Sequence, residues 1–176
     1  MEVEKMMKTM IPAIQKRLKS IKLLAMDFDG VVTDNMVWTF ADGKECVASN
    51  RSDSHGLARL RRLRPDIKTI VISKETDFVV RARCEKLRVE CYMGIIKKLE
   101  LLKEIILKEG IEMKDVAFIG NDINDTECVN ASGVGIAVAD AYPEVKDAAL
   151  IITRCKGGHG AIREIVDAIL EGENDK

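Results

Sequence analysis

The sequence predicts a doubly wound α/β fold, a three-layer α/β/α sandwich built on a mostly parallel sheet. Short β-rich apolar runs alternate with helical patterns, which is typical of right-handed βαβ crossovers. The chain has 176 residues, 47% of them hydrophobic and 32% charged, as expected for one compact domain with a full core. We expect that domain over residues 21–170, after a lead-in helix over residues 1–20 and before a tail over residues 171–176.

Six apolar runs are predicted strands, and segments with helical periodicity lie between them. The strands are expected at Leu23–Met26, Lys68–Ile72, Val89–Met93, Val116–Ile119, Val134–Val138 and Leu150–Ile152. The helices are expected at Ser54–Arg64, Asp77–Leu87, Lys98–Glu109, Asp125–Ala131 and Ala161–Leu170. The third helix places Leu99, Leu102 and Ile105 on one face, and Gly110 follows it as a suitable C-terminal cap.

A predicted β-hairpin interrupts this alternation. The β-rich runs Val37–Phe40 and Glu45–Val47 flank the segment Ala41–Lys44, which contains Asp-Gly, a strong hairpin signal. We therefore expect a hairpin flap over about residues 36–48.

The charge balance excludes two classes of partner. The chain has 28 Lys and Arg against 29 Asp and Glu, a net charge of −1, so we expect no nucleic acid and no anionic membrane as partner. The longest uncharged stretch, Cys128–Ala139, has 12 residues, whereas a membrane-spanning helix needs about 20. The first ten residues mix acids and bases, and the five cysteines contain no C-x-x-C pair. We expect a cytoplasmic protein with reduced thiols.

Acidic side chains follow two of the predicted strands, at the sheet edge where ligands bind in such folds. Asp27 and Asp29 follow the first strand, and Asn121, Asp122 and Asp125 follow the strand at 116–119. Each group could cap the next turn or helix. Because both groups meet at one edge, they favour a divalent-cation site with a nucleophilic carboxylate. Oxygen ligands without His or Cys favour Mg²⁺ over zinc.

A hydroxyl and a lysine pair add to this edge. Ser73 follows the strand at 68–72, and Lys97 and Lys98 open the helix after the next strand. A cation at a helix N-terminus opposes the helix dipole and needs a phosphate or the carboxylates for compensation, unless it is simply a solvated surface side chain. The Ser73 hydroxyl could hold a phosphate oxygen. The ordered set predicts phosphoryl transfer.

The segment at 27–34, Asp-Phe-Asp-Gly-Val-Val-Thr-Asp, resembles motif one of the haloacid dehalogenase superfamily. Ser73, Lys98 and the run Asn121-Asp122-x-x-Asp125 are similar to motifs two, three and four, in the required order. We prefer Lys98 to Lys97 because the family pattern has Lys-Leu at the start of this helix. The resemblance implies a Rossmann-like fold and a phosphatase that works through an aspartyl-phosphate.

The resemblance also implies a role for each motif residue. Asp27 would attack phosphorus, and Asp29 would protonate the leaving oxygen and then activate water. Ser73 and Lys98 would hold the transferring oxygens, and Asp125 would orient Lys98.

The implied Mg²⁺ ligands include one departure from the family. Asp27 and Asp29 match the pattern, but Asn121 stands where the family usually has Asp. The amide oxygen can still bind the ion, although the site loses one negative charge. Either Asn121 or Asp122 would be the direct ligand.

Two features resemble one subgroup of that superfamily. The chain has a hairpin in place of a large cap domain, and it has a glycine-rich segment at 157–164. The subgroup contains phosphatases of 3-deoxy-octulosonate 8-phosphate and of nonulosonate 9-phosphates, together with domains associated with acylneuraminate cytidylyltransferases. Relatives of this kind are typically tetramers in which neighbouring subunits replace the cap. The resemblance implies a homotetramer that acts on a phosphorylated sugar acid and leaves open a pathway link to a cytidylyltransferase.

Five residues are candidate substrate contacts. Glu75, Arg83 and Lys86 match positions in relatives that act on sialic-acid-type nonulosonate 9-phosphates, whereas octulosonate phosphatases commonly have Arg at the first of these and lack the Lys. Thr33 of motif one and His159 of the glycine-rich segment complete the set. Arg83 and Lys86 could instead belong to a solvated helix face.

Two other functions compete with the phosphatase. A catalytically silent assembly domain, as in animal acylneuraminate cytidylyltransferases, would lack the first Asp, which is present here as Asp27. A response-regulator receiver would need an acceptor Asp after the third strand, where the chain reads Tyr92-Met93-Gly94.

Overall fold

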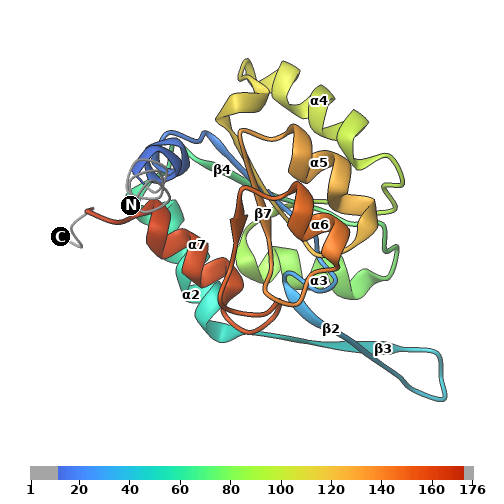
Figure 1. Ribbon diagram of the computed structural model, residues 1–176. Coiled ribbons are helices and arrows are strands. Elements are labelled where there is room, and N and C mark those ends of the chain that lie inside the picture. The colour runs from blue at the N-terminus through green and yellow to red at the C-terminus, as the bar shows by residue number, and fades with distance from the viewer. Residues whose placement is uncertain (1–11, 173–176) are drawn as a thin grey trace.

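A computed structural model describes residues 12–172, and its centre is a six-stranded parallel sheet in the order β5-β4-β1-β6-β7-β8 (Figure 1). The strands are β1 (Leu23–Met26), β4 (Lys68–Ile72), β5 (Glu90–Tyr92), β6 (Val116–Gly120), β7 (Val134–Ala137) and β8 (Ile151–Ile152). Each lies within one residue of its predicted bounds. The predicted doubly wound α/β fold is therefore confirmed.

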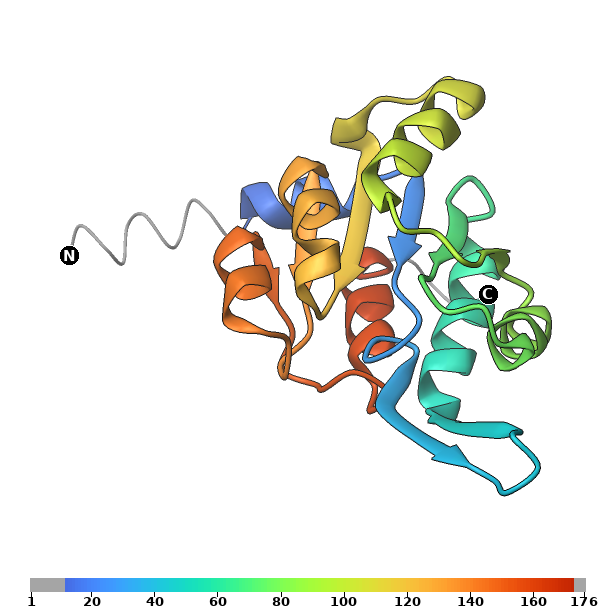
Figure 2. The ribbon, with the colours of Figure 1, turned by 90° about the vertical axis from the view of Figure 1, so that its right-hand side faces the viewer.

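Helices cover both faces of this sheet (Figures 1 and 2). One face carries α2 (Arg51–Leu63), α3 (Phe78–Leu87) and α7 (Ala161–Ile169), with α2 packed along α7. The other carries α4 (Lys98–Glu109), α5 (Thr126–Ala131) and α6 (Pro143–Ala148), which contact one another in sequence order. Two 3₁₀ turns, η1 (Met113–Asp115) and η2 (Ile123–Asp125), flank β6. The sequence analysis did not predict α6, although its first residue is Pro143, a residue favoured at helix starts.

The ends of the chain are only partly described. Residues 12–19 are helical, which agrees with the second half of the predicted lead-in helix. The rest of that helix, residues 1–11, and the end of the predicted tail, residues 173–176, lie outside the described residues.

The centre of the sheet explains where the functional residues lie. All four residues of β1 are fully buried, as expected for a parallel strand covered on both faces. Met26 pairs with Val71 of β4 on one side and Ile119 of β6 on the other. The Asp27 N–H then donates to the Ile119 carbonyl at 3.0 Å, so the ladder continues one residue beyond the strand. This bond places Asp27 at the carboxyl edge, beside the end of β6.

A separate antiparallel hairpin projects from this body (Figures 1 and 2). It consists of β2 (Thr33–Thr39) and β3 (Glu45–Ser49), so it begins earlier than the predicted run at Val37. At the tip, Asp42 Oδ1 accepts the Lys44 N–H at 3.1 Å, and Gly43 has a φ of +83° that favours glycine.

Two further predictions concern membrane-spanning helices and the state of the cysteines. Among residues 12–172, no helix combines the length and the apolarity that crossing a bilayer requires. The five cysteines are all free, and Cys84 and Cys128 are buried.

Candidate active site

The carboxyl edge of the sheet brings together side chains from four separate segments. Asp27 follows β1, Ser73 follows β4, Lys98 opens α4, and Asp125 ends η2 after β6. All four are buried, with no residue more than 5% exposed. Burial of so many polar groups is costly unless they are paired. The Ser73 hydroxyl accepts the Glu75 N–H at 3.0 Å, and the other three side chains contact one another.

Lys98 lies between two carboxylates. Its Nζ is 2.7 Å from Asp27 Oδ1 and 2.8 Å from Asp125 Oδ1. These anions compensate the cation at the N-terminus of α4. The neighbouring Lys97 is exposed and pairs with Glu100 at 2.8 Å. The structure therefore places Lys98, and not Lys97, in the cluster.

Asp125 also shapes the loop that follows β6. Its Oδ2 accepts the N–H groups of Asn121 at 3.0 Å and Asp122 at 3.4 Å. A Cβ at Gly120 would lie 2.5 Å from the Asp125 Cβ, so glycine is required for this close approach. The loop is thereby held with Asn121 buried at the edge.

A small cavity of about 100 Å³ opens at this edge. Its lining includes the carboxylates of Asp27, Asp29 and Asp122, the amide of Asn121 and the Ser73 hydroxyl. The volume suits a phosphate group and a bound ion rather than a whole sugar phosphate.

The cavity fits a divalent cation such as Mg²⁺. Asn121 is 6% exposed, and its Oδ1 is buried without a hydrogen-bond partner. Its amide nitrogen packs against Gly30, where an added Cβ would lie 2.0 Å away. Among the described residues, no three His, Cys, Asp or Glu side chains form a possible metal cluster. The oxygen set here is instead carboxylates plus one amide, which suits Mg²⁺.

Two of the cavity carboxyls have raised pKa values. Burial is the main cause for Asp27, the charge of Asp125 adds to it, and Lys98 opposes both. Burial also raises the pKa of Asp29, and Glu75 and Glu45 act in the same direction. For Lys98, burial alone would lower the pKa, but Asp27 and Asp125 outweigh it and raise the pKa above its ordinary value.

The five candidate substrate residues lie outside this cavity lining. Thr33 is fully buried, and its Oγ1 accepts the N–H groups of Gly30 at 3.2 Å and Asn35 at 3.3 Å. The Glu75 side chain folds over its own loop, where Oε1 accepts the Asp77 N–H at 2.9 Å. Thr33 and Glu75 thus have local structural contacts, and Glu75 also lies near enough to Asp29 to influence its pKa.

The other three candidates are likewise absent from the lining of the phosphate-sized cavity. Arg83 is half-buried on α3 and contacts Ser54 of α2 at 2.7 Å. Lys86 is exposed in the last turn of α3. His159 is exposed in the loop before α7, where its Nδ1 is 2.8 Å from the Gly157 carbonyl oxygen.

Three cavity-lining residues, Asn35, Lys74 and Asn124, were not among the predicted site residues. Asn35 has a φ of +66°, and Lys74 follows Ser73 directly. The position of Lys74 just after a buried strand was a usable signal, because side chains after β-strands line the ligand edge. Asn35 carried no comparable signal.

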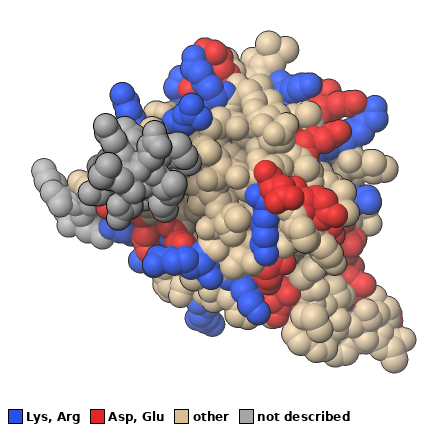
Figure 3. All heavy atoms as spheres, viewed as in Figure 1, with Lys and Arg blue, Asp and Glu red and all other residues tan. Residues whose placement is uncertain are grey.

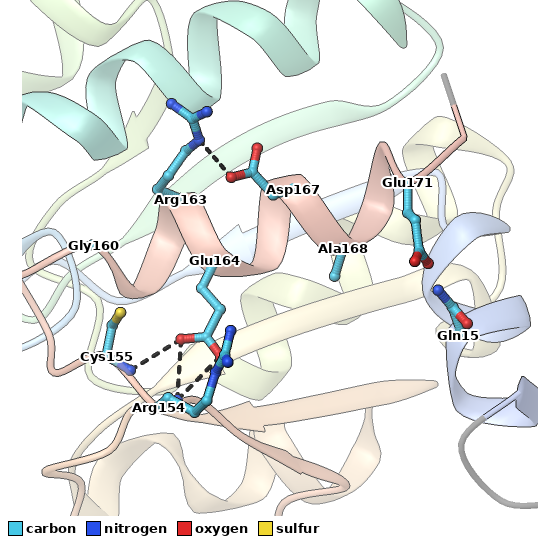
Figure 4. Close-up of a pocket in the computed structure, with 9 residues that line it drawn as sticks. All are labelled: Gln15, Arg154, Cys155, Gly160, Arg163, Glu164, Asp167, Ala168 and Glu171. Atoms are coloured by element: carbon cyan, nitrogen blue, oxygen red, sulfur yellow. Dashed lines mark hydrogen bonds and ion pairs between the residues drawn. The ribbon is translucent and has the colours of Figure 1, made fainter. Parts of the chain in front are cut away.

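A larger hollow of about 760 Å³ lies elsewhere, along α7 (Figure 4). Its charged side chains largely bind one another: Glu164 contacts Arg154 at 3.1 Å and Arg163 contacts Asp167 at 2.7 Å. None of the predicted site residues lines it. The chemistry therefore belongs to the smaller cavity.

Comparisons with known proteins agree with this geometry. The profile of haloacid dehalogenase-like hydrolases matches residues 71–165. The 3-deoxy-D-manno-octulosonate 8-phosphate phosphatase KdsC of Escherichia coli (strain K12) is 33% identical over 155 residues, which cover 88% of this chain and 81% of KdsC.

Two solved structures have the same fold. The phosphatase of that name from Moraxella catarrhalis, in complex with magnesium, phosphate and KDO, superposes with a TM-score of 0.86 and 32% identity, covering 90% of this chain and 91% of that one. The cobalt-bound deoxy-D-mannose-octulosonate 8-phosphate phosphatase from Haemophilus influenzae gives 0.82 and 31%, covering 88% and 90%. With the motifs gathered at one sheet edge, these matches show that the chain belongs to the haloacid dehalogenase-like hydrolases and is a phosphomonoesterase.

Proposed function

We propose that this phosphomonoesterase hydrolyses the phosphate ester of a sugar acid, a nonulosonate 9-phosphate, with Mg²⁺ as cofactor. The observation that carries this proposal is the Lys98 ammonium held between Asp27 and Asp125, beside a cavity lined by oxygen ligands. A fixed cation, a buried carboxylate nucleophile and a phosphate-sized cavity are what phosphoryl transfer needs.

The contacts of Asp27 support an assignment of its attacking oxygen. Lys98 Nζ and the Phe28 N–H both contact Oδ1, each at 2.7 Å. We assign Oδ2 as the atom that bonds to phosphorus while the ester bond to the sugar oxygen breaks. Asp29 donates a proton to that leaving oxygen and then takes one from the water that hydrolyses the aspartyl-phosphate. The raised pKa of Asp29 suits a group that must first act as an acid.

The remaining residues bind charge. Asp27, Asp29, Asn121 and Asp122 would hold the cation. When bound, Mg²⁺ reduces the repulsion between the nucleophile and the anionic phosphate. Lys98 and the Ser73 hydroxyl would contact the transferred oxygens, while Asp125 keeps Lys98 in place.

Two substrate lengths remain as candidates. The combination of Glu75, Arg83 and Lys86 supports a nine-carbon sugar acid, because it resembles the matching positions of phosphatases that act on nonulosonate 9-phosphates. The two cations can bind the carboxylate of such a substrate. The relatives reported above are eight-carbon octulosonate 8-phosphate phosphatases, which supports the shorter substrate as second candidate. Both carry a carboxylate at the end opposite the phosphate.

The exposed apolar surface supports a homotetramer. Met36, Trp38 and Phe40 on the hairpin are each more than half exposed. In the view of Figure 3 the hairpin forms a projecting lobe that is mostly uncharged, and the exposed Asp42–Lys44 ion pair lies at its tip. A second pair, Phe78 at the start of α3 and Ile96 in the loop before α4, is more than 75% exposed. Contact between such groups on neighbouring subunits would bury both and cover the open site.

Phosphate release from a panel of substrates tests the proposed function. The panel contains N-acetylneuraminate 9-phosphate, its deaminated nononate analogue and octulosonate 8-phosphate, each assayed with Mg²⁺. We expect preferential turnover of a nine-carbon ester, and a loss of about 10³-fold or more in Asp27→Asn. Asp42→Asn at the exposed hairpin tip is the matched control and should retain activity.

Other outcomes have distinct meanings. Preference for octulosonate 8-phosphate would replace the nine-carbon substrate with the eight-carbon one. Absence of turnover on every ester, in a folded tetramer, would favour the silent assembly domain associated with a cytidylyltransferase.

A further inference from the structure

We propose that Ser54, in the first turn of α2, is a positioning residue that holds the Arg83 guanidinium where it can meet the carboxylate of the substrate. This inference rests on the proposed function and adds to it a residue that the motifs do not contain. In the sequence, the run Ser52-Asp53-Ser54 is distinguished only as a helix start.

The contacts of Arg83 show why Ser54 matters. The guanidinium Nη2 donates to Ser54 Oγ at 2.7 Å and lies 3.5 Å from the Asn50 carbonyl oxygen. Both acceptors are neutral, and the Asp53 carboxylate acts on Arg83 only through space. Arg83 forms no ion pair among the described residues, so its guanidinium can still bind an anionic ligand. Arg83 Nε is buried and has no hydrogen-bond partner among the described residues. Ser54 thus makes the short hydrogen bond that sets the direction of this side chain.

The local field also favours an anion beside Arg83. Asn50 caps α2, accepting the Ser52 N–H at 2.7 Å, and the helix dipole is positive at this end. A guanidinium next to a helix N-terminus is unfavourable by itself. Asp53 in the same turn offsets part of this cost, and a substrate carboxylate would offset more of it. Arg83 lies outside the phosphate-sized cavity, as expected for a group that binds the opposite end of a long sugar acid.

The first turn of α2 is itself fixed to the active-site loops. Asp53 is 3% exposed, and its carboxylate accepts the N–H groups of Arg163 at 2.7 Å and Gly160 at 3.3 Å. Just before Gly160, the Gly158 N–H donates to the Val31 carbonyl at 3.0 Å, in the loop that follows Asp29. Buried hydrogen bonds therefore hold the first turn of α2 against the catalytic loops. Ser54 positions Arg83 from this fixed turn.

A comparison of two substrates tests this role. Ser54→Ala and Ser54→Thr are assayed on the best sugar-acid phosphate of the panel and on D-arabinose 5-phosphate, which has a phosphate and hydroxyls but no carboxylate. We expect Ser54→Ala to raise the KM for the sugar acid about tenfold while kcat stays within about twofold. The KM for arabinose 5-phosphate should not change, and Ser54→Thr should restore the wild-type value.

The control is Ser52→Ala, because Ser52 is exposed two residues earlier on the same helix. It should leave both KM values unchanged. If the enzyme is active, an equal change of KM on both substrates, or no change on either, would overturn the role of Ser54. The proposed function would still stand. If the wild-type protein turned over none of the sugar-acid esters, the proposed function would fail and this inference with it.

Discussion

Lys98 Nζ lies 2.7 Å from Asp27 Oδ1, and only 2% and 5% of these two residues is exposed. Asp125 contacts the same ammonium at 2.8 Å, so one buried cation faces two carboxylates. This imbalance, together with burial, raises the pKa of Asp27. A cation bound in the adjacent cavity would oppose that shift and keep the nucleophile ionised.

Removal of the buried ammonium should destabilise the fold. Lys98→Met would leave two carboxylates buried without their cation, and we expect a loss of about 3–5 kcal/mol in the free energy of unfolding. Lys97→Met, at the exposed neighbouring lysine, should cost less than about 1 kcal/mol. Urea denaturation of the two variants provides the measurement. Similar losses in both would mean that the buried contacts of Lys98 contribute little.

Asn121→Asp should strengthen Mg²⁺ binding. The added charge would attract the ion, and we expect about a tenfold lower Kd by isothermal titration calorimetry. Without Mg²⁺, the same variant should have a lower Tm than wild type, because another carboxylate joins Asp27 and Asp125. An unchanged Kd would place the direct ligand at Asp122.

Gly157→Ala should disturb the loop that supports the nucleophile. An added Cβ would lie 1.8 Å from the Gly30 carbonyl oxygen, which is backbone and cannot turn aside. We expect a loss of more than about 2 kcal/mol in stability and a large fall in activity. Gly110→Ala is the control, because a Cβ there meets nothing within 4 Å and only its φ of +66° is unfavourable; it should cost about 1 kcal/mol. Equal effects would show that the loop can move.

Glu164 should make stability depend on pH in the acid range. Burial raises its pKa, but hydrogen bonds from the Cys155 and Arg154 N–H groups and from the Arg154 side chain outweigh it and hold the pKa below the ordinary value. The folded state thus favours the charged form. Its contribution is complete above the unfolded pKa of about 4.5 and is lost as pH falls through the lower folded pKa.

Urea denaturation at pH 7 and pH 4 tests this contribution. Glu164→Gln should cost about 1–3 kcal/mol at pH 7 and less at pH 4. Glu127→Gln, at an exposed first-turn position of α5, should show no such difference. A cost for Glu164→Gln that stays the same at both values of pH would contradict the expectation.

The hairpin should control the oligomeric state. Trp38 is 51% exposed, and Trp38→Glu would place a charge in the proposed contact between subunits. We expect a shift from tetramer towards monomer in light scattering coupled to gel filtration. Leu107→Glu, at an 82% exposed position on α4, should leave the assembly intact. A tetramer that survives Trp38→Glu would exclude the hairpin as a major contact.

Local patterns were enough to predict most of the fold. The run Leu23–Met26 could only be a buried strand, because four apolar residues precede a pair of aspartates, and the structure confirms those bounds. Parallel strands share one carboxyl edge, and the observed order, with β6 beside β1, brings Asp27 close to Asn121 and Asp125. Helix α6 has no such pattern, since packing against α5 decides its conformation.

The sequence by itself determined the α/β class, the chemistry of the motif side chains and the edge of the sheet at which they meet, because strand periodicity is local and parallel strands share one carboxyl edge. Only the tertiary structure decided that Lys98 rather than Lys97 contacts Asp27, and that Arg83 contacts Ser54. One residue along a helix turns a side chain by about 100°, and adjacent helices meet at positions that no local pattern encodes. Which polar group is buried and which is solvated therefore depends on packing between segments far apart in the chain.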